Sequence, residues 1–117
     1  MEKAEKAKPV SGGGGTKIKS FRVSPASQSD IQCFGRLVLD TTGCSTLIIG
    51  SVVTISPATL QYVRILDDDG SNVIRNLTNS NNPQSVDVTD YDSILILTYM
   101  TTSGGHGSTD LNNIELR

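Results

Sequence analysis

Short stretches of alternating apolar and polar residues run from residue 17 to the end of the chain, with turn-forming residues between them every eight to twelve positions. Side chains of a β-strand point alternately to opposite faces, so this alternation predicts strands with one buried face. We expect eight strands, at residues 17–23, 31–40, 46–56, 61–66, 73–77, 85–88, 93–101 and 111–116. Strands at this spacing, with no helical period among them, predict an all-β fold, a two-sheet β-sandwich of jelly-roll type.

Three of these strands indicate which side chains form the core. In residues 31–40 the inward face consists of Ile31, Cys33, Gly35, Leu37 and Leu39. In residues 46–56 the inward face consists of Leu47, Ile49, Val53 and Ile55, with Ser51 interrupting it. Residues 93–101 are apolar on both faces, which places this strand in the middle of a sheet.

The N-terminal residues differ from the rest in charge. All five lysines lie among the first 19 residues: Lys3, Lys6, Lys8, Lys17 and Lys19. Residues 1–22 carry a net charge of +4, whereas the remaining 95 residues carry ten acidic groups against four arginines, a net charge of −6. Pro9 and the run Gly12–Gly15 interrupt any helix and form a linker. We therefore expect a flexible basic arm over residues 1–16 that binds a partner through these lysines, and a sandwich domain over residues 17–117.

Composition supports this organisation. A chain of 117 residues is one ordinary domain, and its 44 Gly, Ser, Thr and Asn residues favour turns and short strands over helices. No stretch approaches the roughly 20 apolar residues of a membrane-spanning helix, and the first residues lack the apolar core of a signal peptide. We expect a protein made in the cytoplasm, with no membrane partner.

The two cysteines lie eleven positions apart, at Cys33 and Cys44. In a chain with no recognisable export signal they are expected to be free, buried thiols, with Cys33 on the inward face of its strand. Two cysteines and the single His106 do not make the set of four ligands that a structural zinc ion requires. The sequence predicts no metal site and no cofactor.

Two loops carry the side chains that could bind a ligand. His106, Ser108 and Asp110 share a Gly-rich loop, but a Ser–His–Asp triad needs a rigid frame that one such loop does not supply. Asp67, Asp68 and Asp69 suggest calcium, yet their spacing departs from the helical calcium-binding loop. Asp69-Gly70 instead predicts the turn of a hairpin. We expect no enzyme, and ligand contacts at most from Asp67, Asp68, Asp69, His106 and Asp110.

Nucleic acid is not an expected partner. The basic arm could contact phosphates, but the body of the protein is acidic. Its five aromatic residues show no stacking pattern along the sequence.

The second half of the chain contains the segments YVRILDDDG, SVDVTDYDSILILTY and GGHGSTDLNNIEL. In these segments, which cover roughly half of the chain, it resembles jelly-roll carbohydrate-binding modules of the novel putative carbohydrate-binding (NPCBM) type. The resemblance implies a jelly-roll fold and a glycan as ligand. The sequence departs from the family in having no Trp, on which such modules typically stack sugars.

A small stand-alone jelly roll with a basic arm also looks like the head-decoration, head-fibre and tail-associated proteins of tailed bacteriophages. This resemblance implies a structural protein of the virion, made in the host cytoplasm, that forms a homo- or hetero-oligomer with neighbouring subunits. The alternative function is a stand-alone carbohydrate-binding module that contacts a surface glycan. The alternative locations are the cytoplasm, or the exterior by a non-classical route.

Overall fold

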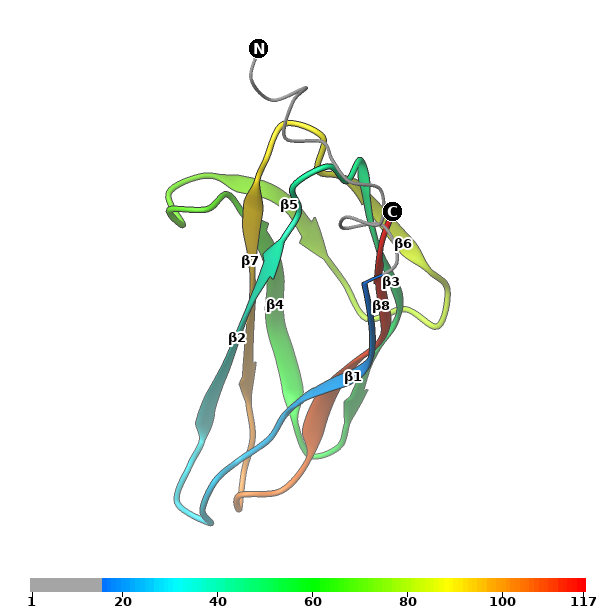
Figure 1. Ribbon diagram of the computed structural model, residues 1–117. Helices are drawn as coiled ribbons and strands as arrows, with labels where there is room; N and C mark the ends of the chain where they lie inside the picture. The colour runs from blue at the N-terminus through cyan, green and yellow to red at the C-terminus, as the bar shows by residue number, and fades with distance from the viewer. Residues whose placement is uncertain (1–15) are drawn as a thin grey trace.

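A computed structural model describes residues 16–117, which form eight β-strands in two sheets (Figure 1). The strands are β1 (Lys17–Val23), β2 (Gln32–Asp40), β3 (Thr46–Ile55), β4 (Thr59–Leu66), β5 (Val73–Leu77), β6 (Gln84–Asp87), β7 (Ser93–Thr101) and β8 (Ser108–Leu116). This part of the chain contains no helix, and so none that could cross a membrane. The expected β-sandwich is confirmed. The expected arm, with Lys3, Lys6 and Lys8, lies outside the described residues except for Thr16.

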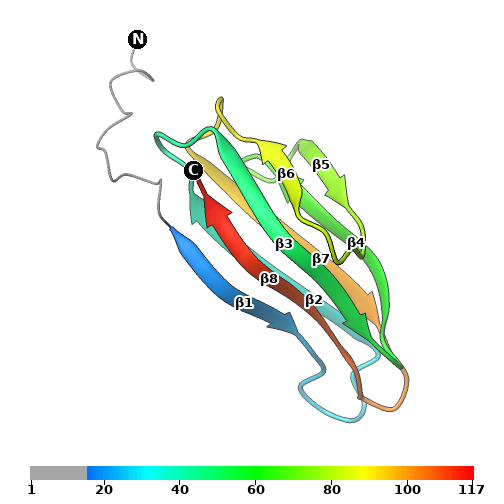
Figure 2. The ribbon, with the colours of Figure 1, turned by 90° about the vertical axis from the view of Figure 1, so that its right-hand side faces the viewer.

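The two sheets have four strands each, in the orders β1-β8-β3-β6 and β2-β7-β4-β5. Figure 2 shows the first sheet in front of the second. Every pairing is antiparallel, and the pairs β1–β8, β2–β7, β3–β6 and β4–β5 are nested one inside the next along the chain. The pairs β3–β8 and β4–β7 then join these hairpin-like pairs side by side into sheets.

The expected strand bounds agree closely with the structure except at the start of the last strand. Residues 108–110 belong to β8, although the sequence indicated a loop there. They extend the strand because β8 lies between two neighbours: Ser108 pairs with Ile55 of β3, and Asp110 pairs with Arg22 of β1. The expectation of Asp110 as a loop residue is therefore wrong.

The core fills the space between the sheets, and most of it comes from the alternating positions. Fully buried residues include Leu47, Ile49, Val63, Ile65, Val88, Ile94, Ile96, Leu111 and Leu116. Two expected core residues, Ile31 and Ile55, are exposed instead. Ile31 precedes the first residue of β2, and Ile55 is the last residue of β3, so neither is covered by the opposite sheet.

The alternation of β3 slips in the middle of the strand. Ile49 and Val52 both face the core, whereas Val53, the expected inward residue, is only half-buried. The same slip occurs on β8, where Asn113 adopts a left-handed backbone with a φ of 54°. Gly50 lies against Asn113 so closely that an added Cβ atom would be 2.8 Å from the Asn113 Cβ. A residue without a side chain is therefore required at position 50.

The strand β7 lies between β2 and β4, so its predicted place in the middle of a sheet is confirmed. Its inward residues Ile94 and Ile96 are fully buried, and Leu95 on the outer side is nearly so. Leu97 and Tyr99 also point outward and are half-buried. This strand therefore supplies apolar side chains both to the core and to the outer surface.

Both cysteines are buried free thiols, as expected. Cys33 packs with Val23 and Met100 near the far end of the sandwich from the β2–β3 loop. Burial raises the pKa of the Cys33 thiol, and the nearby charge of Asp30 adds to this effect. The thiol is therefore a weak nucleophile at neutral pH.

Candidate interaction surface

The outer surface of the sheet β2-β7-β4-β5 carries a cluster of apolar side chains and two arginines. We call this cluster the aromatic face, which consists of Phe34, Arg36, Val38, Tyr62, Arg64, Leu97 and Tyr99. The strand register aligns them in rows, with Tyr99 opposite both Phe34 and Tyr62, and Leu97 opposite both Arg36 and Arg64. Phe34 is 57% exposed and Val38 is 66% exposed, which is unusual for large apolar side chains in regular strands.

Three of the five aromatic rings of the chain meet on this face. The rings of Phe34 and Tyr99 are stacked, with centroids 4.5 Å apart and an interplanar angle of 7°. The ring of Tyr62 is tilted by 56° against that of Tyr99, at 5.4 Å between centroids. The guanidinium carbon of Arg64 lies 3.8 Å from the centroid of the Tyr62 ring. Offset stacking and cation–π contact hold the row together without hydrogen bonds.

Sequence reasoning missed this cluster, because Phe34, Tyr62 and Tyr99 lie on different strands and show no pattern along the chain. One signal was present. Phe34 alternates with the buried Cys33 and Gly35, so an aromatic ring was already assigned to the outer side of its strand. Only the pairing of β2 with β7 and of β7 with β4 brings the three rings into one row.

The outer surface of the other sheet is polar. The Ser20 hydroxyl donates to the Asn112 side-chain oxygen, and the Asn112 amide donates to the Ser51 hydroxyl, so one row of hydrogen bonds crosses β1, β8 and β3. Thr54 is within hydrogen-bonding distance of Thr109 and donates to the side chain of Asn79. These groups are hydrogen-bonded to one another, and the apolar side chains on this face are the half-buried Ile48 and Val53 and the exposed Ile55 of β3.

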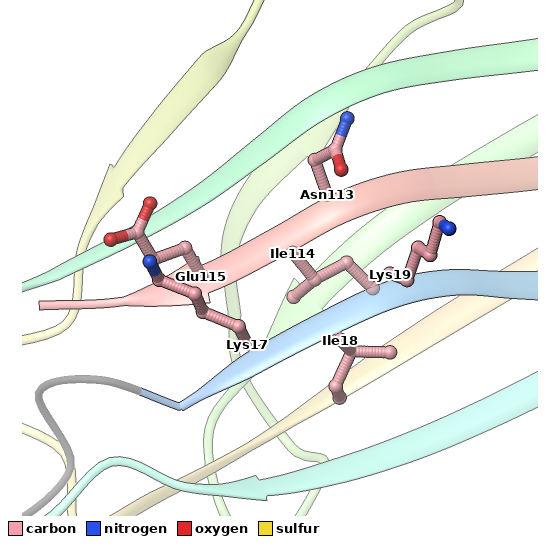
Figure 3. Close-up of a pocket in the computed structure, with 6 residues that line it drawn as sticks. All are labelled: Lys17, Ile18, Lys19, Asn113, Ile114 and Glu115. Carbon is pink, nitrogen blue, oxygen red and sulfur yellow. The ribbon is translucent and has the colours of Figure 1, made fainter.

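A cavity of about 440 Å³ lies at the β1 edge of the polar sheet. Its lining consists of Lys17, Ile18, Lys19, Asn113, Ile114 and Glu115 (Figure 3). Lys17 and Lys19, two of the expected partner-binding residues, therefore belong to this cavity rather than to the aromatic face. Lys17 is the strand partner of Glu115, so the two lysines do not form an isolated cationic site.

The structure separates the two expected ligand loops. Asp67, Asp68 and Asp69 follow β4, whereas His106 follows β7, and these two strands are antiparallel, so the loops lie at opposite ends of the sandwich. His106 is exposed. Asp110 is buried on β8, where its carboxylate accepts hydrogen bonds from Arg22 at 2.7 and 3.1 Å. This ion pair ties β1 to β8 and leaves Asp110 no part in the His106 loop.

The aspartate loop is a closed turn. Asp67 accepts hydrogen bonds from the Asn72 side chain and from the backbone amides of Ser71 and Asn72, and Asp69 accepts from Ser71. The hydrogen bond from the Asn72 side chain is the main reason that the pKa of Asp67 is lowered. Within residues 16–117 this is the one group of three acidic, His or Cys side chains close enough to share an ion. The hydrogen bonds of this group are those of the predicted hairpin turn.

Acidic residues gather at one end of the sandwich, which we call the acidic end. The loops after β2, β4 and β6 lie there, because these three strands run in the same direction. Seven of the ten acidic residues of the described chain belong to it: Asp40, Asp67, Asp68, Asp69, Asp87, Asp90 and Asp92. Thr16 lies at the same end. Its carbonyl accepts a hydrogen bond from the backbone amide of Leu116, and the carbonyl of Arg117, which follows Leu116, accepts one from the amide of Ser45 in the loop after β2. The expected basic arm therefore joins the body beside its most acidic region.

No protein-family model matches the chain, and no curated protein matches it.

Proposed function

We propose that this protein is a non-catalytic structural or interaction module, a subunit of a larger assembly such as the surface of a bacteriophage virion. The observation that carries the proposal is the aromatic face. Its exposed Phe34 and Val38 lie outside the core, opposite Tyr99 and Leu95 of β7, whereas a row of hydrogen-bonded polar side chains crosses the outer face of the other sheet. Exposed apolar clusters of this kind are typical of protein interfaces, which are enriched in Tyr, Phe and Arg.

The sandwich belongs, in this proposal, to the jelly-roll type. The nested pairs β1–β8, β2–β7, β3–β6 and β4–β5 support it, because they describe one long hairpin of the chain rolled into two sheets. Jelly rolls occur both in viral capsids and in lectins, so the topology is compatible with a virion subunit and with a glycan-binding module.

The basic arm contributes a second contact in this proposal. The arm of one copy would bind the acidic end of a neighbouring subunit, because its lysines and the aspartates of that end carry opposite charges. Exposed ion pairs are individually weak and are screened by salt, so the contact requires several charges and many copies. Deleting residues 1–15 should leave the melting temperature nearly unchanged and abolish incorporation into the assembly. Normal incorporation of the truncated protein would reduce the arm to a solubilising tail.

The ring geometry favours a protein partner over a glycan. A sugar stacks on the open face of an aromatic ring. Phe34 and Tyr99 cover one face of each other, and Arg64 covers one face of Tyr62. One face of each ring is therefore already covered, and the rings lie beside the exposed side chain of Val38, a surface suited to packing against apolar side chains.

The alternative function is a stand-alone carbohydrate-binding module. The observation in its favour is the same row of three rings beside Arg64, since Tyr is a common sugar-stacking residue in such modules. A saccharide that raises the melting temperature of the full-length protein, with loss of that shift in Tyr62→Ala, would support this alternative.

Sedimentation of lysates from the producing cells tests the proposal. We expect the full-length protein to travel in particles far heavier than its own 12.5 kDa. The variant Phe34→Ser/Val38→Ser should return it to light fractions with an unchanged circular-dichroism spectrum. The control Ile55→Ser removes an exposed apolar side chain from the other sheet and should have no effect. A wild-type protein that sediments as a monomer, or a double variant that remains in heavy particles, would contradict the proposal.

A further inference from the structure

The sandwich has four edge strands, and three of them are protected against pairing with another chain. Natural proteins protect such edges with lysines, short strands or bulges. β1 carries Lys17 and Lys19, and β6 has only four residues. β5 has five residues, and its register with β4 shifts between Ile65 and Leu66.

The fourth edge strand, β2, is the least protected. It has nine residues, contains neither Lys nor Pro, pairs with β7 in a constant register from Gln32 to Asp40, and carries Arg36 and Asp40 as its charged residues. Within the described chain its backbone forms a ladder with no strand other than β7. Its outward side chains include the two most exposed large apolar residues of the described strands, Phe34 and Val38. This edge can therefore accept another strand.

The outward side chains of β2 specify what that strand should carry. Phe34, Arg36 and Val38 alternate along the edge, and Arg36 is the central residue of the strand. Side chains directly opposite each other on paired strands stabilise the pair when both are apolar or when their charges are opposite. A complementary strand therefore has an acidic residue opposite Arg36, with an apolar residue two positions away on each side.

This chain does not supply such a strand. None of its twelve acidic residues has an aliphatic or aromatic residue at both the second position before it and the second position after it. A second copy of β2, paired over its full length, would place Arg36 opposite Arg36, and like charges opposite each other are destabilising. No segment of these 117 residues matches this pattern and the full-length pairing of two β2 strands is destabilised, so we assign the complementary strand to a different protein.

We propose that the β2 edge binds an extended segment of another protein subunit, in which an acidic residue opposite Arg36 lies between two apolar residues opposite Phe34 and Val38. This inference rests on the proposed function, because it names the partner chemistry of the aromatic face. The added strand would continue the sheet β2-β7-β4-β5 and cover the open face of the Phe34 ring.

Peptide binding to the full-length protein tests the inference. The probe is a labelled nine-residue peptide of Thr residues with a central Glu and a Val two positions away on each side, and the matched control has a central Lys. We expect fluorescence anisotropy to show at least about fivefold tighter binding of the Glu peptide, and Arg36→Glu to reverse this preference. Hydrogen exchange should slow at β2 amides when the Glu peptide is bound. Arg36→Gln, which only removes the charge, should make the two peptides equal if Arg36→Glu fails to fold.

The outcomes separate this inference from the proposed function. Absence of binding, or equal affinity of both peptides for the wild-type protein, would overturn the strand-addition site. Protection of β2 amides that increases with protein concentration alone would overturn it in favour of a second copy. If the inference fails while Phe34→Ser/Val38→Ser still abolishes assembly, the aromatic face binds its partner without strand addition and the proposed function stands.

Discussion

The outer faces of the two sheets differ in the contacts that their side chains make: hydrogen bonds on one sheet, and ring stacking and apolar contacts on the other. On the sheet β1-β8-β3-β6, Ser20, Asn112 and Ser51 form a row of hydrogen bonds across three strands. At the corresponding place on the sheet β2-β7-β4-β5, rings and aliphatic side chains lie in rows, and Phe34 remains more than half exposed. The polar side chains of the first row are hydrogen-bonded to one another, whereas Phe34 and Val38 of the second surface are exposed to water.

This difference shows which apolar residues the fold needs. A two-sheet sandwich is stabilised by the inner faces, where Ile49, Ile65 and Ile96 are fully buried. Apolar side chains on an outer face add little to that core, because no second layer covers them. Phe34 and Val38, the two most exposed large apolar side chains of the described strands, both lie on one sheet, and this is the observation on which the proposed function rests.

The largest expected effect compares the two sides of β7. Ile96→Ala should lower the free energy of unfolding by about 2 to 5 kcal/mol, because the side chain is fully buried between the sheets. Leu97→Ala, on the half-buried outer side, should cost about 1 kcal/mol. Urea denaturation of both variants measures the two losses. Equal losses would mean that the aromatic face is part of the stabilising core.

The next effect concerns the inner side of β2 at Gly35, against which side chains of β1 pack. An added Cβ atom at Gly35 would lie 2.4 Å from the Val23 Cγ2 and 3.0 Å from the Phe21 ring, so Gly35→Ala should cost about 1 to 3 kcal/mol. Combining it with Val23→Ala removes the nearest clashing atom. The added cost of Gly35→Ala should then shrink in that background. An undiminished cost in urea denaturation would locate the strain elsewhere.

A smaller effect compares side-chain coupling on the two outer faces. A double-mutant cycle with Phe34→Leu and Tyr99→Leu should give a coupling of about 0.5 to 1.5 kcal/mol, because the rings are stacked. The cycle with Ser20→Ala and Asn112→Ala breaks an exposed hydrogen bond and should give about 0.5 kcal/mol. A larger coupling on the polar face, measured by denaturation, would reverse the ranking of the two surfaces.

The smallest effect is a pH dependence at the acidic end. The pKa of Asp67 is lowered from its ordinary value of 3.8, mainly by the Asn72 side chain, and the pKa of Asp87 is lowered by Thr89. A lowered folded-state pKa stabilises the protein above the unfolded value, and the stabilisation is lost as the pH falls through the folded value. Asn72→Ala should raise the pKa of Asp67 toward 3.8 in an NMR titration. The pKa of Asp87 should not move, and a shift at both would indicate a long-range change.

The sequence by itself determined the strands, the central place of β7 and the hairpin turn at Asp69-Gly70, because alternation and turn chemistry are local properties of the chain. It also indicated two buried cysteines correctly. These features depend on residues within a few positions of one another. A strand that is apolar on both faces is expected between two other strands of a sheet, and this expectation does not depend on which two strands they are.

Only the tertiary structure decided which side chains meet between strands. It brought Phe34, Tyr99 and Tyr62 into one row and joined Asp110 to Arg22. It also placed Val52 rather than Val53 in the core, because Asn113 on the neighbouring strand breaks the alternation. Each of these contacts depends on strand order and register, which are set by packing between residues far apart in sequence.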